Sequence, residues 1–332
     1  MNNFVAVTIG DINGIGIEIL IDSMIKKKIK NFVLFTNYKI IKNYIKKRKI
    51  KLSINVYNLY FKYDKNSLNI YDFKVKNFED NTIKSLNYAF NLIKKDFFIG
   101  MITLPIRKDL IIKKINKNFV GQTEYLQKLD KKETSNMVFS YKNLIISSLT
   151  THININKIER QISKKNFIYN KIISLHKSLI TDFGIKKTKI LISGLNPHAG
   201  ENGYIGKQEK LFIDPQIKKL KKLKINISGP VSGDSMLNKN NILNYNCFLF
   251  IFHDQALIPF KYISNYSGVN ITANLSIIRT SPDHGTAYNL IGKNIASNKS
   301  LINCFKTVNK IYKNRLKNDK SKKIIKSKFF NW

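Results

Sequence analysis

Short apolar runs that end in polar, glycine-containing turns recur along the chain, and stretches with a helical period lie between them. Apolar positions between residues 80 and 95 recur at spacings of three and four, which predicts an amphipathic helix. The short runs predict buried strands at residues 4–8, 32–35, 98–104, 144–149, 189–193 and 246–252. Alternating strands and helices are typical of α/β proteins, so the pattern predicts that class.

A glycine turn follows the first predicted strand and precedes a helix expected at residues 17–28. Its glycines, Gly10, Gly14 and Gly16, do not have the GxGxxG spacing of a dinucleotide-binding turn. Asp11 and Glu18 would repel a pyrophosphate if they pointed inward. We therefore interpret this segment as a structural turn.

The chain is strongly basic, with 58 Lys and Arg against 21 Asp and Glu and a formal net charge of +37. Such a charge by itself suggests a polyanionic partner. The lysines, however, are spread along the whole chain beside abundant Ile and Asn, and no basic and aromatic residues alternate as in RNA-binding proteins. A biased genomic base composition explains the charge, and a small-molecule partner is favoured over nucleic acid.

Several further features limit the class of protein. No apolar stretch approaches the length that crosses a bilayer, and the N-terminus lacks the basic start of a signal peptide. The two cysteines, Cys247 and Cys304, form no CxxC pair. We expect a soluble, cytoplasmic protein without a membrane partner. The charged run at residues 128–133 suggests a domain change near residue 130.

The densest candidate chemistry follows predicted strands, where ligand sites of α/β proteins lie. His152, His198 and His253 each come just after such a strand and could supply three imidazole nitrogens to a divalent metal. They are separated by 46 and 55 residues, so the fold or a subunit boundary would have to bring them together. Arg279 has a planar side chain that suits a phosphate or carboxylate. His176, in a helical pattern, is interpreted as a partly exposed helix residue.

Taken together, these motifs resemble those of the 4-hydroxythreonine-4-phosphate dehydrogenase family of pyridoxal phosphate biosynthesis. The resemblance extends from residue 10 to about residue 311, in the family's order. Its segments are residues 10–16, 194–201, 253–255, 268–272, 278–281 and 283–287.

The resemblance implies an α/β fold of the isocitrate/isopropylmalate dehydrogenase type, with two α/β/α lobes and an interlobe cleft. It also implies a homodimer whose active site is shared between the subunits. Residues 1–130 and 285–332 are expected to form the first lobe. Residues 131–284 are expected to form the second lobe, with metal and substrate residues.

The resemblance assigns roles by position. The metal, Zn, Mg or Co, is expected at His152, His198 and His253. Apart from the resemblance, the nearby motifs offer Asp234, Asp254 and Lys261 as candidates for proton transfer or ligand orientation, which the sequence does not rank. The expected substrate-binding residues are Gln122, Thr123, Lys261, Asn270 and Arg279. The loop expected to lie against the adenosine part of NAD, or of NADP, comprises Asp283, His284, Gly285, Thr286 and Ala287.

Two residues depart from the family pattern. Gln122 stands where the family has His, and a glutamine cannot carry positive charge. Leu104 stands where the family has Gly, and a leucine would be strained if the backbone there required positive φ.

The implied reaction is the NAD-dependent and metal-dependent oxidation of 4-phosphohydroxy-L-threonine at C3, followed by decarboxylation to 3-amino-2-oxopropyl phosphate. Two alternatives stay open. The first alternative, suggested by Gln122, is a related dehydrogenase that acts on erythronate or threonate 4-phosphate. The second, suggested by the net charge and by Leu104, is a polyanion-binding protein on a decayed enzyme scaffold.

Overall fold

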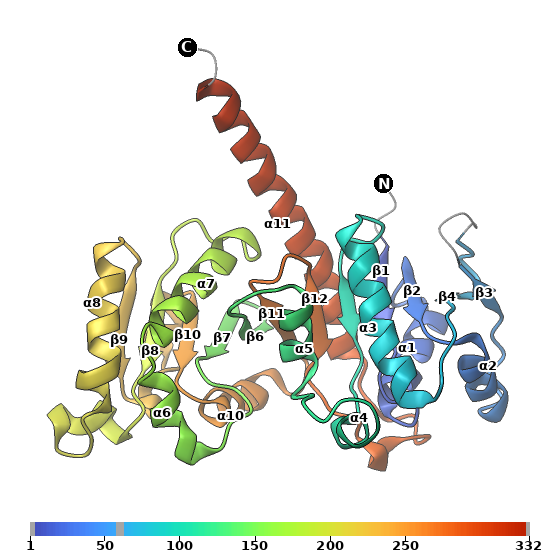
Figure 1. Ribbon diagram of the computed structural model, residues 1–332, viewed down its shortest axis with the longest axis horizontal. Helices are drawn as coiled ribbons and strands as arrows, with labels where there is room; N and C mark the ends of the chain where they lie inside the picture. Colours follow the sequence, from blue (N-terminus) through green and yellow to red (C-terminus); the bar gives the residue numbers. More distant parts are fainter. Residues whose placement is uncertain (1–3, 58–62, 330–332) are drawn as a thin grey trace. The chain divides into compact units, whose positions relative to one another are not determined.

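The computed structural model describes residues 4–57 and 63–329, with side chains up to residue 319. The chain forms two compact units. Unit 1 comprises Met1–Lys131 and Leu275–Tyr312, and unit 2 comprises Lys132–Asn274 and Lys313–Trp332. Each unit combines a sheet with helices, as Figure 1 shows, so the predicted α/β class is confirmed.

Unit 1 contains parallel strands in the order β3-β4-β2-β1-β5-β12. The strands are β1 (Val5–Thr8), β2 (Phe32–Phe35), β3 (Ile54–Val56), β4 (Leu68–Tyr71), β5 (Met101–Thr103) and β12 (Arg279–Pro282). Its helices are α1 (Ile15–Ile25), α2 (Tyr38–Lys47), α3 (Phe78–Lys94), α4 (Lys108–Lys114), α5 (Gln122–Leu129), the 3-10 turn Tyr288–Leu290 and the first part of α11 (Lys299–Phe329).

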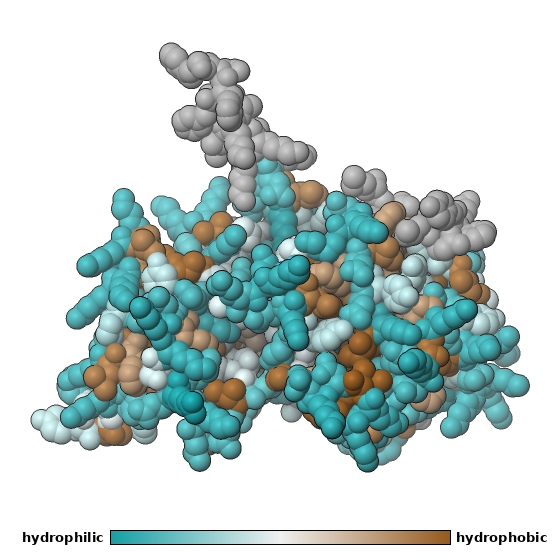
Figure 2. All heavy atoms as spheres, viewed as in Figure 1, coloured by the Kyte–Doolittle hydropathy of each residue, from teal (hydrophilic) through white to brown (hydrophobic). Residues whose placement is uncertain are grey.

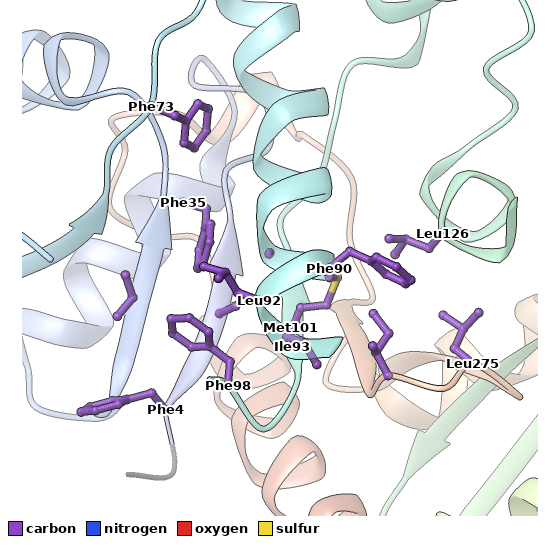
Figure 3. Packing of buried hydrophobic residues seen from close by; sticks show 14 residues of the cluster. Phe4, Phe35, Phe73, Phe90, Leu92, Ile93, Phe98, Met101, Leu126 and Leu275 are labelled. Carbon is purple, nitrogen blue, oxygen red and sulfur yellow. The ribbon is translucent and has the colours of Figure 1, made fainter. Parts of the chain in front are cut away.

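Helix α3 and the strands beneath it form much of the core of unit 1. Asn77 caps the helix, because its side chain accepts a hydrogen bond from the Asp80 backbone N–H at 2.8 Å. The helix packs on β1, β2 and β5, and its Phe90 and Ile93 are buried in one cluster with Met101 (Figure 3). The amphipathic helix predicted for residues 80–95 is therefore confirmed, with its start two residues earlier.

Unit 2 contains strands in the order β11-β6-β7-β10-β8-β9, in which β6 runs antiparallel to both neighbours and the rest are parallel. The strands are β6 (Asn136–Tyr141), β7 (Leu144–Ser148), β8 (Ile190–Ser193), β9 (Ile227–Val231), β10 (Cys247–Phe250) and β11 (Val269–Ala273). The helices are α6 (Ile158–Ile162), α7 (Phe167–Thr181), α8 (Asp214–Lys222), α9 (Lys239–Asn244) and α10 (His253–Ser264). Shorter turns occupy Ile155–Lys157, Pro197–Gly203, Gly233–Ser235 and the π-helical Glu209–Ile213.

The core of unit 2 lies around the aromatic side chains of β10. Phe248 and Phe250 are buried with Ile146, Phe139 and Phe260. This packing fixes β10 next to β7, and β8 pairs with the other edge of β10. The carboxyl ends of these three parallel strands therefore lie at one edge of the sheet.

The units differ from the expected lobes in two segments. Residues 275–284, expected in the second lobe, belong to unit 1, because β12 pairs in parallel with β5 and places Arg279 opposite Met101. Residues from 313 onward, expected in the first lobe, belong to unit 2. There the Arg315 guanidinium pairs with the buried Asp182 carboxylate, its Nε lying 2.7 Å from Oδ1.

Hydrophilic side chains cover most of the face shown in Figure 2. The lysines of the described residues are exposed or half-buried in both units. Within the described part of the chain, no helix has the length and apolar character needed to span a membrane.

Candidate functional site

The first group of predicted site residues surrounds Arg279 in unit 1. This side chain is only 3% exposed. Its Nη2 donates to Gln122 Oε1 at 3.0 Å, and its Nη1 donates to Thr123 Oγ1 at 3.4 Å. Burial lowers the pKa of Arg279 to about 10, so the guanidinium remains protonated at neutral pH. A buried cation oriented by neutral oxygens suits an anionic ligand group.

Gln122 is held in one orientation by its own hydrogen bonds. Its Nε2 donates to the Leu104 carbonyl at 3.1 Å, and its Oε1 accepts from Thr103 Oγ1 at 3.0 Å as well as from Arg279. The carbonyl end of the amide therefore faces the guanidinium. The structure brings together three residues predicted to bind substrate, namely Gln122, Thr123 and Arg279.

The strain considered for Leu104 does not arise. Leu104 is not among the residues with positive φ, and its side chain is buried. A Cβ atom on Gly16 would lie 3.3 Å from Leu104 Cβ, so the glycine allows the first turn to pack closely on the leucine. The departure from the family's Gly is accommodated by packing.

The turn at residues 10–16 packs against the loop expected to bind the cofactor. Ile15 N–H donates to the Thr286 carbonyl at 3.0 Å, and the Tyr288 hydroxyl donates to the Asp11 carboxylate. A Cβ atom on Gly10 would lie 2.0 Å from the Pro105 carbonyl oxygen, which excludes any larger residue. These contacts support the structural interpretation of the turn and place it beside residues 283–287.

The loop itself is held at both ends. Asp283 is buried, and its backbone N–H donates to Ser300 Oγ at 2.9 Å. Ala287 has a left-handed backbone with φ of 43°, and its carbonyl accepts from Leu290 N–H at 3.0 Å. His284 Nδ1 lies 3.0 Å from the Gly285 carbonyl.

The second group of site residues lies in unit 2, at the carboxyl ends of β7, β10 and β8. His152 follows β7 and His253 follows β10, and their ring centroids are 5.4 Å apart. The two segments are joined by a hydrogen bond from Thr150 N–H to the Ile251 carbonyl at 3.0 Å. Both histidines line a pocket of about 280 Å³. The structure therefore brings these two side chains, distant in the sequence, close together.

His198 is placed differently. It follows β8, is exposed, and lies on the loop Pro197–Gly203, where its φ is 50°. Among the residues that the structure describes, no three His, Cys, Asp or Glu side chains are grouped so as to hold a metal ion. One copy of the chain thus pairs His152 with His253 and does not add His198 to them.

The acidic candidates lie beside these histidines. Asp254 Oδ1 is 2.6 Å from His253 Nδ1. Ser232 Oγ donates to Asp234 Oδ1 at 2.5 Å and lowers the pKa of Asp234, to which His198 contributes a smaller effect in the same direction. Each carboxylate is therefore next to a candidate metal ligand.

The remaining substrate candidates are on α10 and β11. Lys261 Nζ lies 5.3 Å from the centre of the Tyr266 ring. Asn270 Oδ1 is buried and has no hydrogen-bond partner among the described residues. A buried acceptor without a partner is uncommon, which makes this atom a candidate ligand contact.

Three residues important to the site were given no role from the sequence. Thr103 orients Arg279, and Gln255 joins two strand ends by accepting from Ile251 N–H at 2.9 Å and from Ser193 Oγ at 3.1 Å. The third, Glu209, contacts the loop of His198. Its acidic side chain among lysines, shortly after the Asn-Pro-His motif, was the available signal.

Comparisons with known proteins give the family. The family model described as "Pyridoxal phosphate biosynthetic protein PdxA" matches residues 23–308. The chain is 34% identical over 308 residues to the 4-hydroxythreonine-4-phosphate dehydrogenase of Sulfurihydrogenibium sp. (strain YO3AOP1), covering 90% of this chain and 94% of that protein. It is also 34% identical over 312 residues to the enzyme of that name from Wigglesworthia glossinidia brevipalpis, covering 90% and 93%.

Solved structures of related proteins have the same fold as this chain. The 4-hydroxythreonine-4-phosphate dehydrogenase from Klebsiella pneumoniae matches with a TM-score of 0.81 at 25% identity, covering 94% of this chain and 98% of that one. A terephthalate 1,2-cis-dihydrodiol dehydrogenase from Burkholderia xenovorans LB400 shares the fold, with a TM-score of 0.59 at 21% identity over 92% and 97% of the chains. The motifs, the fold and the matches agree, and the chain belongs to the PdxA family of pyridoxal phosphate biosynthetic proteins.

Proposed function

We propose that this chain is an NAD-dependent 4-hydroxythreonine-4-phosphate dehydrogenase, an oxidoreductase of pyridoxal phosphate biosynthesis. Family membership supports the reaction class. The observation that carries the substrate assignment is the buried Arg279, whose guanidinium is oriented by Thr103, Gln122 and Thr123. A buried planar cation suits a phosphate group, whose oxygens would take the place of some of these neutral acceptors.

We assign the other ligand contacts to Asn270, Lys261 and the loop at residues 283–287. The unpartnered Oδ1 of Asn270 would accept a hydrogen bond from a substrate hydroxyl or ammonium group. Lys261 would supply a proton or a positive charge to the oxidised substrate. The loop at residues 283–287 would lie against the adenosine part of NAD, with NADP as a second candidate cofactor.

The histidines fit a divalent metal such as Zn²⁺, Co²⁺ or Mg²⁺, with the imidazole donors favouring the first two. His152 and His253 are close together, and His253 Nδ1 faces Asp254, which leaves Nε2 for the ion. His198 of a second copy would complete the set. When bound, the metal would act as a Lewis acid toward the C3 hydroxyl.

Exposed apolar side chains on unit 2 support a homodimer. Ile258 and Tyr262, one helical turn apart on α10, are 71% and 89% exposed, and Leu211 is 60% exposed. Large apolar side chains gathered on one helix face mark interaction surfaces. The partner would be a second copy of this chain. Cytoplasmic location is also proposed, supported by the two free, buried cysteines, Cys247 and Cys304.

An absorbance assay for NADH tests the proposal. Purified protein with 4-phosphohydroxythreonine, NAD and added Mg²⁺, Zn²⁺ or Co²⁺ should form NADH, and His198→Ala should abolish this activity and weaken metal binding to what His152 and His253 alone provide. Retained metal-dependent turnover in His198→Ala would remove the metal role of this residue.

The same assay separates the alternatives. Gln122, a neutral side chain at the anion site, favours a test of erythronate and threonate 4-phosphate as second substrates. A higher kcat/KM with either would reassign the substrate. Salt-sensitive DNA binding without NADH formation would instead favour a polyanion-binding protein.

A further inference from the structure

The loop that carries His198 has an unusual backbone. Its residues 198–202 have φ values between 44° and 84°, and four of these five residues are not glycine. The left-handed conformation costs about 1–2 kcal/mol for each non-glycine residue. Such a segment persists only where its surroundings hold it in place.

The carboxylate of Glu209 provides that support. Its Oε1 accepts hydrogen bonds from the backbone N–H groups of Leu195 and Asn196, both at 2.8 Å. Its Oε2 accepts from Asn196 Nδ2 at 2.9 Å. Glu209 is 3% exposed, and all three donors are neutral. Both oxygens of a buried anion are therefore bound to the segment that enters the loop.

Two glycines allow the carboxylate to approach this closely. A Cβ atom on Gly194 would lie 3.0 Å from Glu209 Oε1, and one on Gly200 would lie 2.7 Å from Oε2. Gly194 precedes the loop and Gly200 lies within it. The carboxylate thus contacts the loop on both sides of His198.

The π-helical turn that begins at Glu209 is attached to the loop at further points. Asn196 Nδ2 also donates to Gln208 Oε1 at 2.7 Å, and Lys210 Nζ donates to the Asn202 carbonyl. Three consecutive residues, 208–210, therefore bind the loop. Glu209 is the buried one of the three.

We propose that Glu209 is a positioning residue that fixes the left-handed loop and so places His198 for metal binding. This inference rests on the proposed metal role of His198. Glu209 is not a ligand itself, because its oxygens are occupied by the loop and are shielded from solvent. A carboxylate is required, since an amide at this position could accept at one end only and would set its NH₂ against a donor at the other.

The test is the metal affinity of the purified full-length protein, measured by competition between Zn²⁺ or Co²⁺ and a chromogenic chelator. Glu209→Gln should weaken metal binding about 10- to 100-fold, the loss typical of residues that support a ligand. Glu201→Gln is the matched control, since Glu201 is exposed on the same loop. It should leave the affinity unchanged. Unchanged affinity in Glu209→Gln would overturn the proposal.

A double mutant separates positioning from general stabilisation. If Glu209 acts through His198, Glu209→Gln should cause no further loss in a His198→Ala background. Losses that add would show a role independent of His198 and would overturn the proposal. Should Glu209→Gln fail to fold, Asn196→Ala removes the side-chain bonds to Glu209 Oε2 and Gln208 Oε1 but keeps the carboxylate, and a smaller loss of metal affinity is expected.

The two proposals fail in different ways. If His198→Ala leaves metal affinity unchanged, the metal role of His198 is wrong and the inference falls with it. If His198→Ala loses the metal but Glu209→Gln and Asn196→Ala do not, only the role of Glu209 is wrong.

Discussion

Arg279 donates two hydrogen bonds to Thr103 Oγ1, from Nε at 3.1 Å and from Nη2 at 2.7 Å, although 176 residues separate them in the chain. The pairing of β12 with β5 sets this relationship, because Arg279 lies opposite Met101 in the parallel register. The guanidinium plane is thereby fixed before any ligand arrives.

Arg279→Lys should weaken substrate binding although it keeps the charge. A lysine ammonium cannot reproduce the paired donors, and hydrogen bonds to charged groups contribute about 1.5–3 kcal/mol. The KM for the phosphorylated substrate should therefore rise about 10- to 100-fold. Steady-state kinetics measure this, and an unchanged KM would show that the phosphate binds elsewhere.

Gln122→Glu should also weaken substrate binding, by a different cause. The new carboxylate would lie about as far from Arg279 Nη2 as the present Oε1, at 3.0 Å, and would neutralise the guanidinium. The KM should rise while the fold is retained. Gln127→Glu, on the same helix α5, changes the charge equally and is the control. Equal effects of both substitutions would contradict this explanation.

Removal of the metal by a chelator should abolish NADH formation without unfolding the protein. His152 and His198 are exposed side chains on loops, and the cores of both units contain none of the three histidines. Circular dichroism should give nearly the same thermal midpoint with and without chelator. A large drop in this midpoint would indicate a structural metal instead.

His176 should make stability depend on pH. Its Nδ1 lies 2.8 Å from Thr188 Oγ1, and burial lowers its pKa. The unfolded chain takes up a proton near the ordinary histidine pKa of about 6.5, whereas the folded chain does so only at lower pH. Stability should therefore fall as the pH drops below that value. Urea unfolding of the wild type and of His176→Gln near neutral and mildly acidic pH should show a smaller fall in the variant.

Local patterns in the sequence predicted much of what the structure contains. Periodicity in the sequence shows features that depend on neighbouring residues. These features are helix α3, the strands at residues 4–8 and 246–252, and the position of the histidines after strands. His176 is partly exposed, as its place in a helical pattern predicts.

Other features depend on contacts between distant segments. The order β7-β10-β8, which brings His152 next to His253, is not encoded in any one segment. The same holds for β12, whose pairing with β5 moved residues 275–284 out of the expected lobe. Glu209 was missed although it follows the Asn-Pro-His motif closely, because a buried carboxylate and an exposed one look alike in a lysine-rich sequence.

The discontinuity of unit 1 also determines when its anion-binding residues come together during synthesis. All strands of unit 2 come from one uninterrupted stretch, so its sheet can form as soon as residue 274 has left the ribosome. The first five strands of unit 1 emerge earlier but lack β12. The polar atoms of Thr103, Gln122 and Thr123 therefore stay hydrated until Arg279 has been translated and β12 has paired with β5.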